Sequence, residues 1–399
     1  MKVWLISELF YPEEVSTGYV MTKIAEKIAE DFSVNVICGP SEYESDVFKA
    51  NYSINNSIKI HRVTVPNLNK NNLFLRIIRM LLLTFKMGIK LYANVEKGDK
   101  VILVTNPASL LVFVSFLKRF KGFKYIIIVH DVFPENLIPA GILSSKSILY
   151  RLLISIFNYA YNSANQLITV GHDMKNLISA KVNKSMKIDV IQNWADAEDI
   201  YPIIDFNLNE YYKEDFSNKI VIQFAGNIGR VQGLKDFFTL FKEANNPDLV
   251  IAIIGEGALK SSLMEMKNLE GLNNIHFYDA KPRFEQLYFL NACHIGLITL
   301  SEGMYGLGVP SKTYNILAAG KPLLFIGDKD SEISQYINGS DTGWAFTWDE
   351  TEKIVKFLNN LNYSDLIAIT QKGKNSRRLV NEYFTREVIL NKYKQLLFQ

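Results

Sequence analysis

Short apolar, β-rich runs alternate with longer helical patterns along almost the entire chain. The runs of the first half are predicted to be strands: Lys2–Ser7, Val34–Cys38, Lys59–Val63, Val101–Thr105, Tyr125–Val129, Leu167–Val170 and Ile188–Ile191. Helical patterns lie between them, at Gly18–Asp31, Pro107–Phe120 and Ser145–Ser163. Several of the runs are apolar at nearly every position, which is typical of parallel strands covered on both faces. The first half is therefore predicted to be a doubly wound α/β domain.

The same alternation starts again in the second half. Its predicted strands are Ile220–Phe224, Leu249–Ile254, Ile275–Tyr278, Ile295–Ile298, Leu323–Phe325 and Gly343–Phe346. The interruption at Ala195–Asn218 is acidic, rich in Asn and Tyr, and contains Pro202, as is typical of a linker between domains. Since 399 residues exceed a typical single domain, we expect two α/β domains of about 150–200 residues each.

Composition argues against several other classes of protein. With 48% hydrophobic and 21% charged residues the chain is globular, and a net charge of +3 is too small to indicate nucleic-acid binding. Cys38 and Cys293 lie far apart without CxxC spacing, which favours free buried thiols over a disulfide framework or a zinc site. Glu8 interrupts the N-terminal apolar run, so that run is predicted to be a strand and not a secretory signal. No uninterrupted apolar run reaches the roughly 18–20 residues of a spanning helix, and we expect a cytosolic protein.

Three glycine-containing turns lead into predicted helices: Tyr11–Gly18, Gly226–Gly233 and Gly306–Lys312. In doubly wound sheets such turns lie at the carboxyl ends of strands, where ligands bind. In the second turn the glycines would let a phosphate approach the backbone, and Arg230 would supply a cation. A tight strand–helix turn with an exposed arginine explains the same pattern equally well, and the GxGxxG fingerprint of dinucleotide binding is absent. A further turn of this kind, Gly255-Glu256-Gly257, is a weaker signal by itself.

The last part of the third turn, Gly308–Lys312, leads into a short predicted helix that ends at Gly320. Pro310 lies at or just before the helix start, and Ser311 is a candidate cap. A lysine and a hydroxyl at this place favour an anion, and Asn315 follows Ser311 on the same helix face. The alternative interpretation is a well-capped short helix without a ligand.

Motifs in both halves follow a fixed order along the chain: Tyr11-Pro12, Val129–Glu135, Ser163–Val170, Val190–Trp194, Gly226–Gly233, Gly255–Gly257, Pro310–Pro322 and Tyr383–Thr385. Together they resemble glycosyltransferase family 4, of GT-B fold, and within it the branch that builds colanic acid, capsule and O-antigen. The resemblance implies two Rossmann-like domains that face each other across a cleft. Residues 1–200 would bind the acceptor, residues 201–380 the nucleotide sugar, and the helix at about 381–399 would pack back on the first domain.

The resemblance also implies which residues bind the donor. The expected set is Gly226, Asn227, Gly229, Arg230, Gln232, Glu256, Lys281, Pro310, Ser311, Lys312 and Asn315. Two glutamates of the family pattern are replaced here by Leu307 and Asn315, and its Arg and Lys diphosphate clamp by Asn227 and Gln232. Arg230 and Lys312 are the cations left nearby, and we expect them to hold the diphosphate.

In the N-terminal half the resemblance points to His130, at the end of an apolar strand, as a catalytic residue beside the donor sugar, together with Arg230. A histidine satisfied within the strand–loop junction is the alternative. The expected acceptor-binding residues are Ser16, Thr17, Gly18, Asp131 and Glu135. The implied reaction is retaining, without a metal or other cofactor. Asp328-Lys329-Asp330 resembles the DxD metal signature of another glycosyltransferase fold but lacks its context.

The stretch Leu73–Ala93 is strongly apolar and carries four cations: Arg76, Arg79, Lys86 and Lys90. On a helix these fall within about 80° of one another. Such a stripe suits the interface of an anionic membrane, and a mostly buried helix with one solvated edge explains it equally well. Acceptors in the resembled branch are saccharides on a polyprenyl diphosphate. We therefore expect a peripheral protein on the inner face of the cytoplasmic membrane, with a nucleotide sugar, a lipid-linked saccharide and an anionic membrane surface as partners, and no nucleic acid.

The branch resemblance favours UDP as the nucleotide and an N-acetylated hexosamine or deoxyhexosamine as the sugar. Two alternative functions fit the same scaffold. A sugar-nucleotide 2-epimerase would need carboxylates around the sugar, and the glycine turns offer few. A non-catalytic partner subunit is the second alternative, because the two family glutamates are missing.

Overall fold

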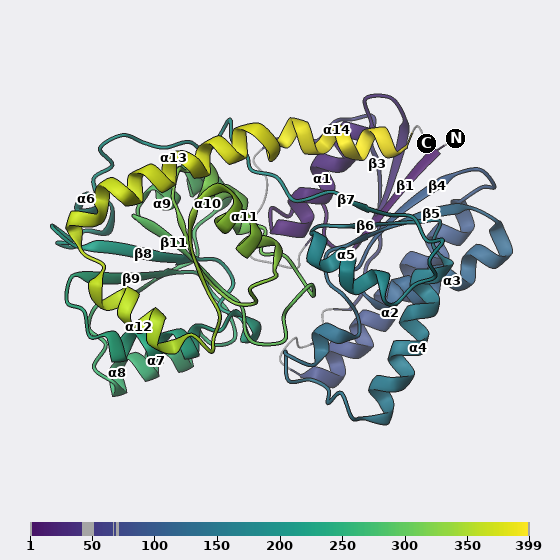
Figure 1. The fold of residues 1–399 in the computed structure, drawn as a ribbon. Helices are drawn as coiled ribbons and strands as arrows, with labels where there is room; N and C mark the ends of the chain where they lie inside the picture. The colour runs from purple at the N-terminus through teal and green to yellow at the C-terminus, as the bar shows by residue number, and fades with distance from the viewer. Residues whose placement is uncertain (1, 42–51, 67, 69–71, 398–399) are drawn as a thin grey trace. The chain divides into compact units, whose positions relative to one another are not determined.

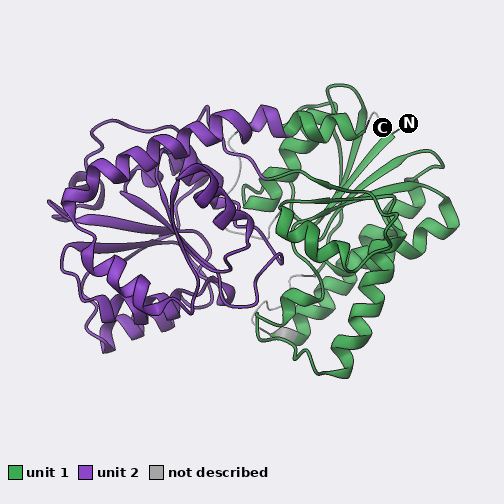
Figure 2. Ribbon diagram, in the orientation of Figure 1, with its two compact units in different colours: residues 1–192, 390–399 green, residues 193–389 purple. Residues whose placement is uncertain are grey.

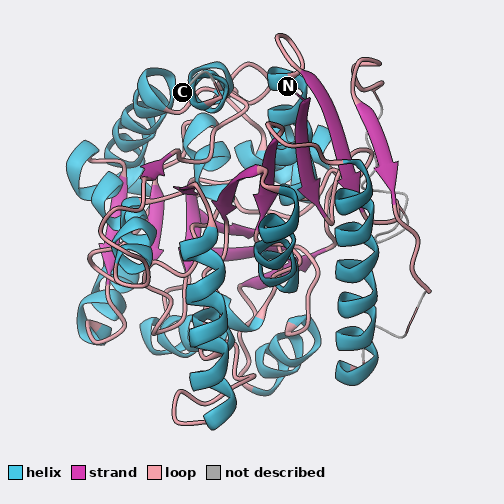
Figure 3. Ribbon diagram, turned by 90° about the vertical axis from the view of Figure 1, so that its right-hand side faces the viewer, coloured by secondary structure: helices cyan, strands magenta, loops and turns pink. Residues whose placement is uncertain are grey.

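The computed structural model describes residues 2–41, 52–66, 68 and 72–397. The chain divides into two compact units (Figure 2). Unit 1 comprises residues 1–192 and 390–399, and unit 2 comprises residues 193–389. Helices lie around the strands (Figure 3).

Unit 1 contains a seven-stranded sheet in the order β3-β2-β1-β4-β5-β6-β7. All neighbouring strands are parallel. The strands are β1 (Lys2–Ser7), β2 (Ser33–Cys38), β3 (Lys59–Arg62), β4 (Lys100–Val104), β5 (Lys124–Val129), β6 (Gln166–Thr169) and β7 (Ile188–Val190). The order reverses between β1 and β4, so this sheet has its ligand-binding switch point there.

Unit 1 also contains five helices and one 3₁₀ turn within the described ranges, followed by the end of α14 (Figure 1). They are α1 (Ser16–Ile28), α2 (Leu73–Asn94), α3 (Ser109–Lys121), η2 (Glu135–Leu137), α4 (Ile148–Ser163), α5 (His172–Ser179) and α14 (Arg386–Leu396). Local signals set their ends: the Asn72 side chain accepts from two N–H groups of α2, and Gly122 ends α3 in the left-handed conformation. Near the end of α14, Lys394 pairs with Glu30 at 2.9 Å.

Unit 2 contains a six-stranded parallel sheet in the order β10-β9-β8-β11-β12-β13. Its strands are β8 (Ile220–Ala225), β9 (Leu249–Ile254), β10 (Ile275–Tyr278), β11 (Ile295–Thr299), β12 (Leu323–Ile326) and β13 (Gly343–Phe346). The helices and turns are α6 (Leu208–Tyr212), η3 (Arg230–Gln232), α7 (Leu234–Ala244), α8 (Lys260–Leu269), η4 (Arg283–Glu285), α9 (Gln286–Asn291), α10 (Lys312–Ala318), α11 (Glu332–Ser340), α12 (Thr351–Asn360), η5 (Tyr363–Asp365) and α13 (Leu366–Tyr383). The switch point of this sheet lies between β8 and β11.

The predicted fold class, two doubly wound parallel α/β sheets, is confirmed. Each predicted strand matches an observed strand with ends that differ by at most one residue. The match follows from burial, because β8, β9, β11 and β12 are buried at every position. The thiols of Cys38 and Cys293 are both free and buried, and desolvation raises the pKa of each to about 11.

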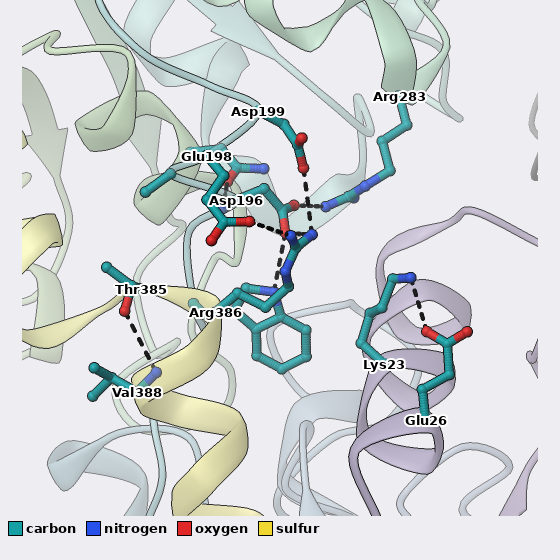
Figure 4. A network of polar contacts seen from close by, with 12 residues as sticks. Lys23, Glu26, Asp196, Glu198, Asp199, Arg283, Thr385, Arg386 and Val388 are labelled. Carbon is teal, nitrogen blue, oxygen red and sulfur yellow. Dashed lines mark hydrogen bonds and ion pairs between the residues drawn. The ribbon is translucent and has the colours of Figure 1, made fainter. Parts of the chain in front are cut away.

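The predicted linker Ala195–Asn218 has more structure than its composition indicates. It contains α6, whose first turn is capped by the Asn207 side chain. Its first residues are bonded within unit 2: the Asp196 carboxylate pairs with Arg283 and Arg386 (Figure 4). Arg377 donates to the carbonyls of Ala197 and Ile200 at 2.8 Å and 2.6 Å. The acidic character of this segment thus serves ion pairs with arginines distant in the sequence.

Candidate functional site

Two glycine turns meet at the carboxyl ends of β8 and β9 in unit 2. The Gly226 N–H donates to the Ile254 carbonyl at 2.9 Å, and the Ile228 N–H donates to the Glu256 carbonyl at 2.8 Å. Gly226 and Gly255 have φ values of +140° and +151°, which side chains rarely allow. A Cβ on Gly255 would lie 2.0 Å from the Gly226 oxygen, so only glycine fits. The two turns therefore present bare backbone beside the switch point.

Lys312, the first residue of α10, extends under the Gly226 turn. Its Nζ lies 3.3 Å from the centroid of the Phe224 ring and 3.5 Å from Oε1 of Gln232. A Cβ placed on Gly226 would lie 3.7 Å from the same Nζ. Among the described residues Lys312 has no ion-pair partner, and burial lowers its pKa well below the ordinary 10.5. Desolvation disfavours the charged ammonium unless an anion accompanies it, so a lysine in this position beside bare backbone is a candidate for binding an anion.

The β8 turn contains the other predicted residues of this group. Asn227 and Arg230 have exposed side chains, and the described residues include no ion-pair partner for Arg230. The turn is fixed to the end of β11: Thr299 Oγ1 donates to the Gln232 carbonyl, and the Ser301 N–H donates to the Val231 carbonyl at 3.0 Å. Of the predicted donor residues Gly226, Asn227, Gly229, Arg230 and Gln232, the structure brings Gly226 and Gln232 into contact with Lys312.

Four further predicted donor-site residues have other local roles. Glu256 is exposed and pairs with Lys260. Lys281 is exposed and pairs with Glu285 at 3.7 Å. The Pro310 carbonyl accepts from the N–H of Thr313 at 3.2 Å. The Ser311 side chain does not cap α10, in contrast to the prediction, because its backbone is already helical at φ −62° and ψ −26°.

Asn315 is buried, and both polar atoms of its amide are occupied within unit 2. Its Oδ1 accepts from the Asp196 N–H at 3.0 Å, and its Nδ2 donates to Oε1 of Gln286 at 3.1 Å. A ribose hydroxyl would have to compete with these bonds. The ribose-binding role of Asn315 stays a prediction.

In unit 1, Thr105 organises the residues that follow β5. Its Oγ1 accepts from the N–H groups of His130 and Asp131, both at 3.1 Å. The Nε2 atom of His130 is buried and has no hydrogen-bond partner in the described part of the chain. Desolvation lowers the pKa of His130 to about 4, so the ring is neutral at pH 7. Desolvation raises the pKa of the Asp131 carboxyl to about 6, although the residue as a whole is exposed.

Glu135, a predicted acceptor residue, forms a largely buried ion pair with Lys181. This pair and the bond from the Phe133 N–H to the Tyr161 hydroxyl, at 3.1 Å, fix the loop after β5. Glu135 thus has a structural partner that its local sequence does not reveal. At the start of α1, Ser16 is exposed and Gly18 is buried, where a Cβ would lie 2.6 Å from the Glu13 carbonyl oxygen.

The prediction that all four α2 cations face a membrane is wrong for Arg79. Its guanidinium pairs with Glu8 at 2.9 Å, and both side chains are only 11% exposed. Lys86 donates to the Thr64 carbonyl at 2.7 Å, so its ammonium also bonds back to the protein. The alternative, a mostly buried helix with one solvated edge, is wrong as well, because Phe and Leu side chains of α2 are exposed on its outer face.

We expect the His130 ring to stay neutral from pH 7 down to about pH 4, because burial disfavours its imidazolium form. An NMR titration of the ring protons of the five histidines measures this directly, with His130→Gln assigning the signal. The midpoint should lie near 4. A midpoint near the ordinary 6.5 would show instead that the ring is hydrated.

Two parallel α/β sheets, the second with glycine turns beside its switch point, define a protein of the doubly wound class. Comparison with known proteins identifies it further. The family described as "Glycosyl transferases group 1" matches residues 211–372. The probable glycosyltransferase WbjE of Pseudomonas aeruginosa is 32% identical over 98% of this chain and 96% of its own length. The chain therefore belongs to the group 1 glycosyl transferases, glycosyltransferase family 4, and is a glycosyltransferase.

Two more distant proteins agree with this assignment. The putative colanic acid biosynthesis glycosyl transferase WcaI of Escherichia coli (strain K12) is 23% identical over 60% of each chain. A solved structure of HepE from Anabaena, in complex with UDP and glucose, matches 100% of both chains with a TM-score of 0.71 and 13% identity. The fold predicted from the resemblance, GT-B, is thereby confirmed.

No helix within the described ranges is long and apolar enough to cross a membrane. In the same residues no group of three or more His, Cys, Asp or Glu side chains is arranged to hold a metal ion.

Proposed function

We propose that this enzyme transfers a sugar, with retention of configuration, from a UDP-sugar to a saccharide carried on a polyprenyl diphosphate, in the synthesis of a surface polysaccharide. The observation that carries the proposal is Lys312, whose side chain lies beside the bare Gly226 turn, has a pKa lowered by desolvation, and has no ion-pair partner among the described residues. A diphosphate is the anion that such a site fits, because backbone N–H groups and one desolvated cation both stabilise its charge.

Relatives support the choice of substrates. WcaI is described as a colanic acid biosynthesis enzyme, and HepE has been solved with UDP and glucose. We assign the nucleotide and diphosphate to unit 2, with Asn227, Gln232, Glu256 and Asn315 as further donor ligands. We assign acceptor binding to unit 1, near Ser16, Thr17 and Asp131. For the sugar, the branch resemblance favours an N-acetylated hexosamine or deoxyhexosamine.

In the proposed mechanism the bond between the anomeric carbon and the diphosphate oxygen breaks as the acceptor oxygen approaches from the same face. Lys312 and Arg230 stabilise the negative charge that grows on the departing UDP. The acceptor hydroxyl passes its proton to a departing phosphate oxygen, so no protein base is required. We assign to His130, which is neutral at pH 7, a catalytic hydrogen bond that adds no charge.

Arg230→Ala should lower turnover by at least about tenfold, because one fixed cation near the leaving group is lost. The Arg230 side chain is exposed, so the variant should fold normally. Steady-state release of UDP measures the rate, and circular dichroism checks the fold. Near-normal turnover in the folded variant would remove Arg230 from the mechanism.

The decisive experiment incubates the enzyme with each member of a panel of UDP-sugars and a polyprenyl-diphosphate-linked saccharide acceptor. The proposal predicts a lipid-linked product longer by one sugar, with the α or β configuration of the donor retained. An epimerised UDP-sugar formed without acceptor would point to a 2-epimerase. Donor binding without transfer to any acceptor would point to a non-catalytic subunit. We place the reaction at the inner face of the cytoplasmic membrane, where such acceptors are accessible to nucleotide sugars.

A further inference from the structure

Three helices of unit 1 lie side by side: α2 packs on α3, and α3 packs on α4 (Figure 1). Aromatic rings connect them across the surface. Phe85 of α2 contacts Phe113 of α3, and Phe116 of α3 contacts Tyr159 of α4, with centroid distances of 6.0 Å in both pairs. Because Phe113 and Phe116 are one helical turn apart, these contacts form a single continuous band.

The outer face of this band is apolar and open to solvent. Its exposed large side chains include Phe74 (68%), Phe85 (54%), Phe116 (50%), Phe120 (74%), Ile148 (85%) and Leu152 (56%). On α2 the exposed residues recur at helical spacing and cover one face, while Leu83, Met87 and Leu91 on the opposite face are fully buried. An apolar face that extends over three helices is larger than the scattered exposed side chains of an ordinary surface, and it indicates an interaction site.

The charge of the same helices is entirely positive. α2 contains four cationic residues, α3 contains three and α4 contains one, and none of the three helices contains Asp or Glu. Two of the cations lie against aromatic rings between the helices: Lys121 Nζ is 4.8 Å from the Tyr92 ring, and the Arg119 guanidinium is 5.4 Å from the Tyr159 ring. The apolar band is therefore bordered by positive charge.

We propose that this band, formed by the exposed side chains of α2, α3 and α4, docks on the surface of an anionic lipid bilayer. Aromatic and aliphatic side chains would enter the boundary between headgroups and acyl chains, and the cations beside them would meet anionic headgroups. A second copy of the chain is disfavoured as the occupant, because a two-fold contact would place the same cations opposite one another. The biological role of this docking rests on the proposed function, because the proposed acceptor is linked to a lipid. The band itself contains none of the residues that we propose for donor binding.

Vesicle binding by the full chain tests the inference without donor or acceptor, so its failure is distinguishable from that of the proposed function. The full chain should sediment with vesicles containing phosphatidylglycerol and much less with vesicles of phosphatidylcholine alone. The variant Phe120→Ser/Ile148→Ser should bind at least about tenfold more weakly, because two exposed apolar anchors are lost.

The matched control is Phe284→Ser/Ile367→Ser in unit 2, whose side chains are similarly exposed at 68% and 85%. It should bind vesicles like the unaltered protein. Equal loss in both variants, or unchanged binding in the first, would overturn the inference. So would a lipid-free dimer, seen by sedimentation velocity, that Phe120→Ser/Ile148→Ser converts to monomers, because the face would then be an interface between copies.

Discussion

Lys312→Met is expected to lower turnover by about 100-fold or more while leaving the folded protein as stable as before or more stable. Turnover falls because the variant loses the desolvated cation beside the Gly226 turn, where the proposed mechanism develops leaving-group charge. Stability does not fall, because methionine fills a similar volume and removes a charge that the fold desolvates without pairing. UDP binding by calorimetry, turnover and urea unfolding measure the three quantities separately.

The pH dependence of both properties should change in the same variant. Burial lowers the pKa of Lys312 well below 10.5, so between the folded-state pKa and 10.5 the unfolded chain binds more protons than the folded one. The free energy of unfolding contributed by Lys312 therefore rises with pH in that window. If Lys312 binds the diphosphate as proposed, UDP binding should weaken over the same window, because the diphosphate needs the protonated ammonium. Neither effect should remain in Lys312→Met.

Lys321→Met provides a matched control. Lys321 is a second lysine whose pKa is lowered by burial, and its nearest titratable influence is Cys293 rather than the glycine turns. Its replacement should affect stability in the same direction as Lys312→Met and leave UDP binding and turnover close to normal. If both variants lost UDP binding equally, a general loss of positive charge would explain the result, and the specific role of Lys312 would be wrong.

Asp196→Ala is expected to lower the free energy of unfolding of unit 2 by about 3 kcal/mol. The Asp196 side chain is only 4% exposed and pairs with both Arg283 and Arg386 (Figure 4). Removing it leaves two guanidinium groups without their shared carboxylate, and the Trp194 Nε1–H loses its acceptor at 3.3 Å. Urea unfolding followed by tryptophan fluorescence suits the measurement, because Trp194, Trp344 and Trp348 all lie in unit 2.

Glu198→Ala is the control for this prediction. Glu198 also pairs with Arg386, at 3.0 Å, but its side chain is 79% exposed. Solvent screens that pair, so its loss should change the unfolding free energy by less than about 1 kcal/mol. If Glu198→Ala and Asp196→Ala had equal effects, the buried position of Asp196 would not matter.

The sequence was sufficient to predict the strands, the two sheets and the glycine turns. The signals for these features are local: an all-apolar run gives a buried parallel strand, and Gly226 and Gly255 occupy backbone conformations that other residues rarely adopt. The same reasoning could have predicted Thr105 as a residue of the unit 1 site. Thr105 directly follows an apolar strand, at the same edge of the sheet as His130. The contact between Lys312 and Phe224 has no such signal, because it joins residues on different strand–helix connections.

Only the tertiary structure decided which charged and polar groups are already paired. Glu8 neutralises Arg79 from 71 positions away, Lys181 neutralises Glu135 from 46 positions away, and Asp196 binds Asn315 from 119 positions away. Local periodicity determines where a strand or helix forms and which of its faces is apolar, because those preferences act over a few residues. The partner of a charge, and hence whether it is free to bind a ligand or a membrane, depends on segments that meet only when the sheet is assembled.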